Sequence, residues 1–357
     1  MRLDIIDGMR GHLLIGMMSV HLSFLGAGHL FGLIHHVTLI GMFDAEFFVV
    51  ISGFLIGYLT TLRMNETQQF RRFLRKRMVT IYKYYLATCI PFGLMFLIDK
   101  GAAAFATEAL PRILTVQDGG LFADILPIYL YCFVILFALT LYSHKRYGPL
   151  LVVSGVIHIA SQFDFGTGFF GFGGDFLSFD IAAWQFLFIL SYIAGLERQR
   201  IAALIARPND ITIVGVVAIL AIGVVGFRFW YIYPYPIEVP PDVNMGILPR
   251  WQLHPIFVVK IGVFCLLVAI LLTREHILFR PARAVMEWYF RPGFLRTIGS
   301  YSIQMFTLHV FLCEVFDAAK SGLDSGGRYA LGLALLAAFI AAPNIWVAVK
   351  ARRARAA

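Results

Sequence analysis

The sequence predicts an all-α, polytopic integral membrane protein with about ten transmembrane helices around a central polar cavity or tunnel. Of its 357 residues, 59% are hydrophobic and 14% are charged, and the mean hydropathy is +0.78. Long apolar segments recur along the whole chain, and most basic residues fall on one side of them. This composition excludes an ordinary soluble domain.

The apolar segments place ten candidate spans, and no internal repeat, low-complexity tail or soluble domain interrupts them. We therefore treat residues 1–357 as a single transmembrane domain. The fifth span is the shortest, and a Gly/Phe-rich stretch over residues 163–176 follows it. The expected limits are 11–31, 40–61, 79–98, 121–142, 148–162, 179–196, 210–231, 255–273, 299–317 and 329–349.

The distribution of Lys and Arg sets the orientation. With the N-terminus inside, 22 of the 30 basic residues lie in inner segments, which predicts that both termini are cytoplasmic. The net charge of +9 therefore reflects topology in a lipid bilayer and gives no reason to expect nucleic-acid binding. The outer loops at 29–37, 163–176 and 233–255 are rich in Phe, Tyr, Pro and Gly. They suit either an aromatic belt at the headgroups or a surface that stacks on sugar rings.

The four cysteines are isolated from one another and lie inside apolar segments, where free buried thiols are expected. No spacing typical of a metal site or a disulfide framework is present, so neither is predicted. They are Cys89, Cys132, Cys265 and Cys313.

The first span carries the sharpest functional candidate. Arg10 and His21 are eleven residues apart, which is about three turns of a helix, so both side chains project from one face. His21 is expected near the bilayer middle and Arg10 at its inner edge. An ionisable group at that depth indicates function, although a histidine also serves as a hydrogen-bonded packing residue. Asp7 is placed to hold the Arg10 guanidinium, or is a solvated charge.

The second span carries two carboxylates in its outer half, Asp44 and Glu46, and Ser52 near its centre. A carboxylate beside a buried imidazole orients or activates it, and Glu46 is the more deeply placed of the two. Gly53 and Gly57 form a small-xxx-small pair that permits close approach of another helix.

A dense basic cluster precedes the third span. It is explained by the positive-inside rule alone, or by recognition of a phosphorylated cytoplasmic co-substrate. Its members are Arg71, Arg72, Arg75, Lys76 and Arg77.

Further polar groups lie in or near the later spans and indicate a polar interior. They do not by themselves distinguish a transport pathway from a catalytic cavity. These groups are Asp124, His158, Trp184, Gln185, Lys260, His309 and Glu314.

Several motifs together resemble the membrane acyltransferase-3 superfamily. They are DGMRG with a histidine eleven residues after its arginine, FFVVISGFLI over 47–56, and FRRFLRKRMVTIYKYY over 70–85. The segments DAEFFVVISG, FADILPIYLY and FDIAAWQFLFIL resemble the OpgC branch more narrowly. The resemblance covers most of residues 1–196 and returns at IGSYSIQMFTLHVF, which resembles a late Gly-x-x-Ser-x6-His span.

The resemblance implies a membrane O-acyltransferase that moves a short acyl group, succinyl or acetyl, from cytoplasmic acyl-CoA to an extracytoplasmic glycan. It implies a multi-pass protein of the bacterial inner membrane with no permanently bound cofactor, and it leaves a homodimer open. His21 would act as general base or be acylated first, Arg10 would steady the donor, and Glu46 would orient His21. The basic cluster would hold the acyl-CoA phosphates. Substrate-binding roles are expected for Asp7, Asp44, Ser52, Asp124, Trp184, Gln185 and His309.

Two other functions fit parts of the pattern. In a proton-coupled transporter of a glycan or small organic acid, His21 would belong to a proton relay. Transporters usually show repeated halves, and the sequence shows no such symmetry. A structural membrane subunit would need neither a histidine at mid-membrane nor an arginine on the same helix face.

Overall fold

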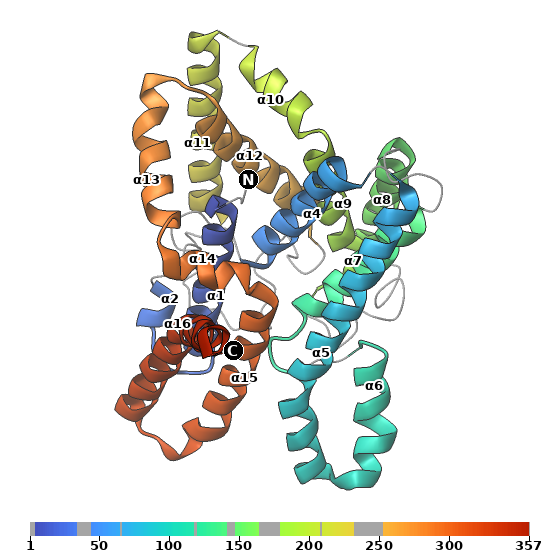
Figure 1. Ribbon diagram of the computed structural model, residues 1–357, viewed down its shortest axis with the longest axis vertical. Helices are drawn as coiled ribbons and strands as arrows, with labels where there is room; N and C mark the ends of the chain where they lie inside the picture. Colours follow the sequence, from blue (N-terminus) through green and yellow to red (C-terminus); the bar gives the residue numbers. More distant parts are fainter. Residues whose placement is uncertain are drawn as a thin grey trace.

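The computed structural model describes residues 4–33, 44–64, 66–117, 120–140, 147–163, 179–207, 209–231 and 253–356. Within these ranges the chain is helical and contains no strand, which confirms that the fold is all-α (Figure 1). Parts of the outer loops expected to be aromatic lie outside the described residues.

The longer helices correspond one to one with the predicted spans. Their bounds are α1 Asp4–Phe24, α4 Asp44–Arg63, α5 Thr67–Ala104, α7 Ile125–Leu139, α8 Tyr147–Ser161, α9 Ile181–Leu196, α11 Asp210–Tyr231, α12 Pro255–Thr273, α15 Ser302–Ala319 and α16 Ser325–Ala356. Shorter elements connect them: α2 Leu30–Leu33, η1 Phe105–Ala109, α6 Leu110–Leu114, α10 Arg198–Ala206, η2 Ile277–Phe279, α13 Arg280–Phe290, α14 Gly293–Ser300 and η3 Lys320–Gly322.

Five segments of the described chain are long and apolar enough to cross a membrane, and a sixth is added if α10 and α11 count as one bent span. The helices α7, α8 and α9 are apolar but shorter. The protein is therefore a multi-pass membrane protein, whereas the number of ten spans and the side of the termini stay predictions.

The first helix is displaced from its predicted limits of 11–31. It runs from Asp4 to Phe24 because Gly26, with φ of +95°, ends it. The amide of Ala27 bonds the carbonyl of Leu22, and the amide of Gly26 bonds that of Ser23, which is a Schellman cap. The sequence predicted His21 halfway along the first helix. In the structure His21 lies in the last turn of α1.

The helix α4 packs along α9, in agreement with the predicted close approach at Gly53 and Gly57 (Figure 1). A methyl group at Gly57 would overlap the carbonyl oxygen of Tyr192, and one at Gly53 would meet that of Phe188. Gly195 on α9 faces the backbone of Phe54 in the same way. Small residues on both helices thus bring the two main chains into contact.

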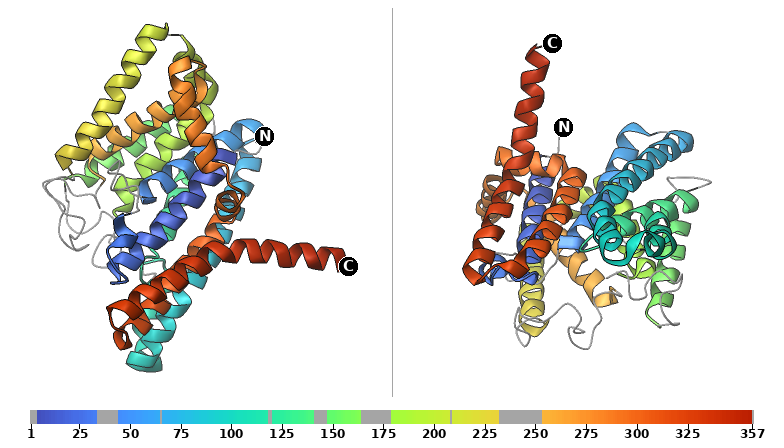
Figure 2. Two further views of the ribbon diagram at one scale, coloured as in Figure 1. Left: turned by 90° about the vertical axis from the view of Figure 1, so that its left-hand side faces the viewer. Right: turned by 90° about the horizontal axis from the view of Figure 1, so that it is seen from below.

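The helix α1 makes a second such contact, with α14. Side chains at Gly8, Gly11 or Gly299 would overlap carbonyl oxygens of Phe290, Leu295 and Asp7, respectively. One large core joins α1, α4, α7, α9 and α15. A smaller cluster joins α10, α11, α12 and η2 and consists of Ile205, Ile213, Ile270 and Phe279. The end of α16 projects away from the other helices (Figure 2).

Candidate active site

The helices α1 and α15 contact each other through two pairs of polar side chains. Arg10 Nη2 donates a hydrogen bond to Ser302 Oγ, and His21 Nδ1 lies 2.8 Å from His309 Nε2. Eleven residues separate Arg10 from His21, and seven separate Ser302 from His309. Both spacings are near whole numbers of turns, so one face of each helix supplies both of its contacts. The sequence predicted the face of α1 but not its partner.

A phenylalanine that the sequence did not identify covers His21. The rings of His21 and Phe122 stack with centroids 3.8 Å apart and planes inclined by 14°. Phe122 has φ of +57°, which is uncommon for a bulky residue. The preceding amide, of Leu121, donates to Glu314 Oε1 on α15 at 3.3 Å. Helix α15 therefore supplies His309 and also anchors the segment that stacks on His21.

The arginine of α1 is held from two sides. Besides the bond to Ser302, Arg10 Nη1 lies 3.8 Å from Asp7 Oδ1, which is the predicted contact. Tyr129 of α7 lies within electrostatic range of Arg10. Its hydroxyl accepts a hydrogen bond from Ser52 Oγ at 3.3 Å. Ser52 is therefore linked to the surroundings of Arg10 through Tyr129.

The two carboxylates at the start of α4 face different partners. Glu46 Oε2 lies 3.8 Å from Lys260 Nζ of α12, and these side chains are 0% and 3% exposed. Asp44, which is also buried, interacts electrostatically with His309. The sequence favoured Glu46 as the carboxylate beside the imidazole. In the structure the Asp44 carboxylate acts electrostatically on His309, and a role of Glu46 in orienting His21 stays a prediction.

Two predicted substrate-binding residues take part in helix packing. The Gln185 carboxamide accepts from Ser154 Oγ at 2.6 Å, and it donates to the carbonyls of Ser154 at 2.9 Å and Ala182 at 3.0 Å. Trp184 is fully buried and meets Phe179 edge to face, with centroids 4.7 Å apart. The two bonds between Gln185 and Ser154 tie α9 to α8. Asp124, a further residue predicted to bind substrate, lies elsewhere and directly precedes α7.

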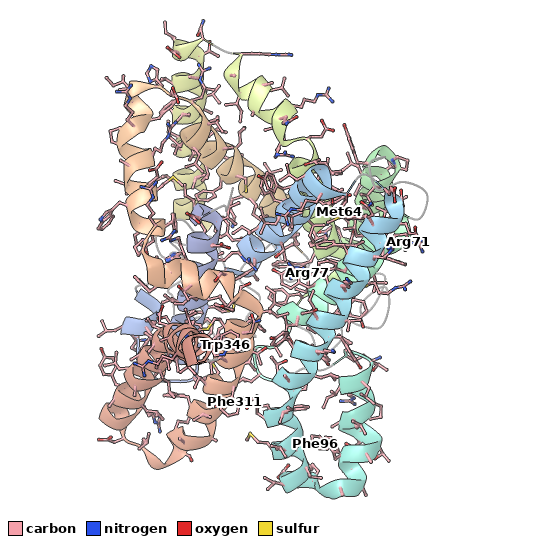
Figure 3. All side chains as sticks on the ribbon, viewed as in Figure 1. Met64, Arg71, Arg77, Phe96, Phe311 and Trp346 are labelled. Carbon is pink, nitrogen blue, oxygen red and sulfur yellow. The ribbon has the colours of Figure 1, made fainter. Side chains whose placement is uncertain are left out.

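The predicted acyl-CoA-binding cluster forms part of α5, because this helix begins at Thr67 and not at residue 79, the predicted start of the third span. Arg71 and Arg77 lie at different levels of this helix (Figure 3). Arg71 packs over the ring of Phe137 at 4.7 Å, and Arg77 packs over that of Phe73 at 5.8 Å. Arg77 also lies within electrostatic range of Arg10. The remaining members are exposed: Arg72, Arg75 and Lys76.

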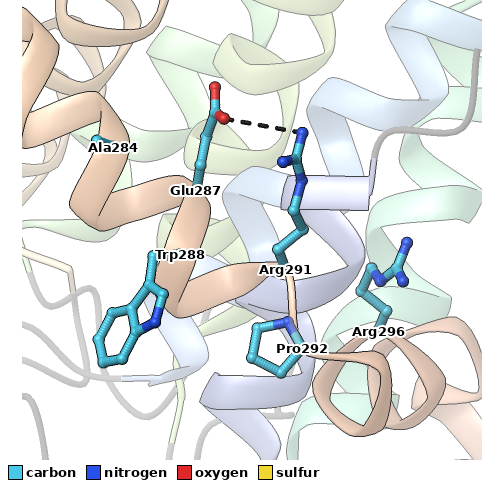
Figure 4. Close-up of a pocket in the computed structure, with 6 residues that line it drawn as sticks. All are labelled: Ala284, Glu287, Trp288, Arg291, Pro292 and Arg296. Atoms are coloured by element: carbon cyan, nitrogen blue, oxygen red, sulfur yellow. Dashed lines mark ion pairs between the residues drawn. The ribbon is translucent and has the colours of Figure 1, made fainter.

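One pocket of about 590 Å³ lies on α13 and α14, and no predicted site residue is among those that line it (Figure 4). Trp288 stands 76% exposed at this pocket. Its two arginines are engaged by carboxylates: Arg291 pairs with Glu287 at 3.8 Å, and Arg296 pairs with Asp4 at 3.1 Å. The sequence placed a polar cavity at the centre of the bundle, and that cavity stays a prediction.

The histidine pair has one more neighbour with ligating chemistry. His21, His309 and Cys313 each offer an atom, and these atoms all lie within 4.8 Å of one another. The sequence did not predict this group because its members are not adjacent in the chain. The only local signal was the spacing of four between His309 and Cys313, which places both on one face of a helix.

Together, the fold and the site define an all-helical, multi-pass membrane protein with a part-buried histidine pair where two helices meet. The family model described as "OpgC protein" matches residues 2–355, so the chain belongs to the OpgC family. Membership of this family implies an acyltransferase. No curated protein matches the chain. No solved structure matches it either.

Proposed function

We propose that this protein is a membrane O-acyltransferase that moves a short acyl group, succinyl in the first instance, from cytoplasmic acyl-CoA to a glycan hydroxyl outside the cytoplasm. The observation that carries the proposal is the pair of His21 and His309 at 2.8 Å in a member of the OpgC family. The bacterial inner membrane, with both termini in the cytoplasm, is the proposed location.

The histidine pair provides a general base. When His21 Nδ1–H donates to His309 Nε2, His21 Nε2 carries no proton, and its lone pair can accept one. His21 Nε2 then takes the proton of the sugar hydroxyl, and the oxygen attacks the thioester carbonyl carbon. The tetrahedral intermediate collapses by breaking the carbon–sulfur bond. The departing thiolate of coenzyme A takes the proton back from the imidazolium of His21, so the enzyme returns to its starting state.

The charges around the pair favour this sequence of steps. The imidazolium formed during attack shares its Nδ1 proton with His309, and Asp44 acts electrostatically on His309. A buried carboxylate near a developing positive charge stabilises it. Asp44 thus supports the transition state through His309 in this proposal.

Acyl-CoA is polyanionic, and the arginines of α1 and α5 supply the complementary charge. Arg10 is fixed by Asp7 and Ser302, and Arg77 lies within its electrostatic range. Arginine suits phosphate and carbonyl oxygens because its donors are arranged in a rigid fork. We assign the donor phosphates to the basic cluster of α5, and the thioester to the region between Arg10 and His21.

The test is acyl transfer by the full-length purified protein in liposomes, with labelled succinyl-CoA or acetyl-CoA outside and a glucan acceptor supplied to the other face. Removal of a general base lowers turnover by about 10²–10⁴-fold, so His21→Ala should lose transfer to this extent while its thermal stability holds. Substantial residual transfer in this variant would overturn the role of His21. Passage of unmodified glycan across the membrane without acyl transfer would instead favour the transporter.

A further inference from the structure

We propose that His21, His309 and Cys313 form a binding site for a single soft first-row metal ion such as Zn²⁺, and that the bound ion blocks acyl transfer. The ligating atoms of the three residues already lie within 4.8 Å of one another. His309 and Cys313 come from successive turns on one face of α15, and His21 comes from α1. The binding part of the proposal is independent of the proposed function, and the blocking part rests on it.

The ligand set matches the chemistry of zinc. Imidazole nitrogen and thiolate sulfur are its preferred donors, and sites with three protein ligands keep a fourth position open. At zinc–nitrogen and zinc–sulfur distances of about 2.0–2.1 and 2.3 Å, neighbouring ligand atoms of a tetrahedron are about 3.3–3.7 Å apart. The present distances extend from 2.8 Å for the two nitrogens to at most 4.8 Å in the group. Side-chain shifts of about 1 Å therefore complete the site.

The surroundings hold these ligands in place. His309 and Cys313 are both 0% exposed, and His309 Nδ1 has no hydrogen-bond partner within the described part of the chain. No hydrogen bond at Nδ1 therefore opposes the small shift of the ring that brings Nε2 to the ion. The helices that carry the ligands are fastened together by the bond between Arg10 and Ser302. Preformed ligands on rigid elements favour metal binding.

The nearby charges suit a cation. Asp44 interacts electrostatically with His309, and Glu314 does so with Cys313. A Zn²⁺ ion with one thiolate and two neutral imidazoles carries one net positive charge. Two carboxylates near that charge compensate it in a medium of low dielectric constant.

Binding removes the base. The thiol proton of Cys313 is released to solvent as the sulfur–metal bond forms. With the ion on Nδ1 of His21, the single proton of the neutral ring lies on Nε2. That nitrogen then has no lone pair for the sugar hydroxyl, so transfer stops until the ion leaves.

The test uses Co²⁺ as a spectroscopic substitute for Zn²⁺, with the full-length protein purified in detergent on a tag without histidine. We expect one Co²⁺ per chain, the visible bands of tetrahedral cobalt, and a thiolate-to-cobalt charge-transfer band that Zn²⁺ abolishes. Cys313→Ser should remove the charge-transfer band, and Cys313→Ala is the second variant if the first unfolds. Cys265→Ser is the matched control, because Cys265 lies on α12 and is not in the ligand group.

The acyl-transfer assay supplies the second measurement. Zn²⁺ should inhibit the wild-type protein and Cys265→Ser equally, whereas Cys313→Ser keeps the metal-free activity and loses the inhibition. If Co²⁺ gives no thiolate band, or if the two cysteine variants behave alike, the site is refuted. If the cobalt spectrum appears in a protein with no acyl transfer, the site stands, and the proposed function fails together with the blocking role.

Discussion

Replacement of His309 by phenylalanine tests whether this residue positions His21. The ring of phenylalanine fills similar space but accepts no hydrogen bond, so it leaves His21 Nδ1–H without the acceptor now 2.8 Å away. His21 becomes an imidazolium only in the transition state, and a hydrogen bond from a charged group is worth about 1.5–3 kcal/mol. At about 1.36 kcal/mol per tenfold change in rate, its loss should lower kcat by about 10- to 150-fold. In the proposed function His309 acts through its contact with His21, and not in the substrate-binding role that the sequence predicted. KM for both substrates should therefore change little.

The conservative control is His309→Gln, whose side-chain oxygen sits the same number of bonds from Cβ as Nε2 of histidine and accepts a hydrogen bond. We expect this variant to recover part of the kcat lost in His309→Phe, with both variants unfolding at similar temperatures. The assay is steady-state transfer from labelled acyl-CoA in liposomes, with kcat and KM determined separately. An unchanged kcat in His309→Phe, or a loss that appears only in KM, would refute the positioning role.

Three further predictions concern other contacts. Removing one partner of the buried pair, as in Lys260→Met, should destabilise the fold by about 3–5 kcal/mol, whereas Glu46→Leu with Lys260→Leu should recover most of that loss in chemical denaturation. If this double variant is stable but inactive, Glu46 also acts on His21; full activity would leave it a structural role. Gly57→Ala should lower the unfolding temperature, at a cost of about 1–3 kcal/mol. Gly215→Ala, where the added methyl meets nothing within 4 Å, is its control, and equal effects of the two would contradict the packing argument. Paired replacement of Arg71 and Arg72 by glutamine should raise KM for acyl-CoA. An unchanged KM would mean that the basic cluster only sets the orientation of the protein in the membrane.

The parts of the fold that follow from local pattern were predictable. Apolar length located the helices, and the spacing of Gly53 and Gly57 identified the close contact of α4, although not α9 as its partner. The limits of α1 were missed because Asp4 and Asp7 start the helix early and Gly26 ends it. Hydropathy alone does not register a glycine cap.

The candidate site was only half predictable because its contacts join distant parts of the chain. The spacing of Arg10 and His21 showed that they share a face, but nothing local indicated that His309, 288 positions later, meets His21. The same holds for Lys260 and its ion pair with Glu46. Two positions in a helix differ by about 200° in direction, so a sequence with carboxylates at 44 and 46 does not show which one faces the imidazole.

The position of His309 depends on the tilt of α15, because the bond between Arg10 and Ser302 holds only the start of this helix. Ser302, at the start of α15, accepts the bond from Arg10. His309 lies seven residues further along, about 10 Å away along the helix axis. A tilt of about 10° around Ser302 would move the His309 imidazole by about 1.8 Å. Directed away from α1, this movement would lengthen the present 2.8 Å contact with His21 to about 4.6 Å, which is beyond a hydrogen bond. A small tilt of α15 would therefore be enough to disconnect His21 from His309.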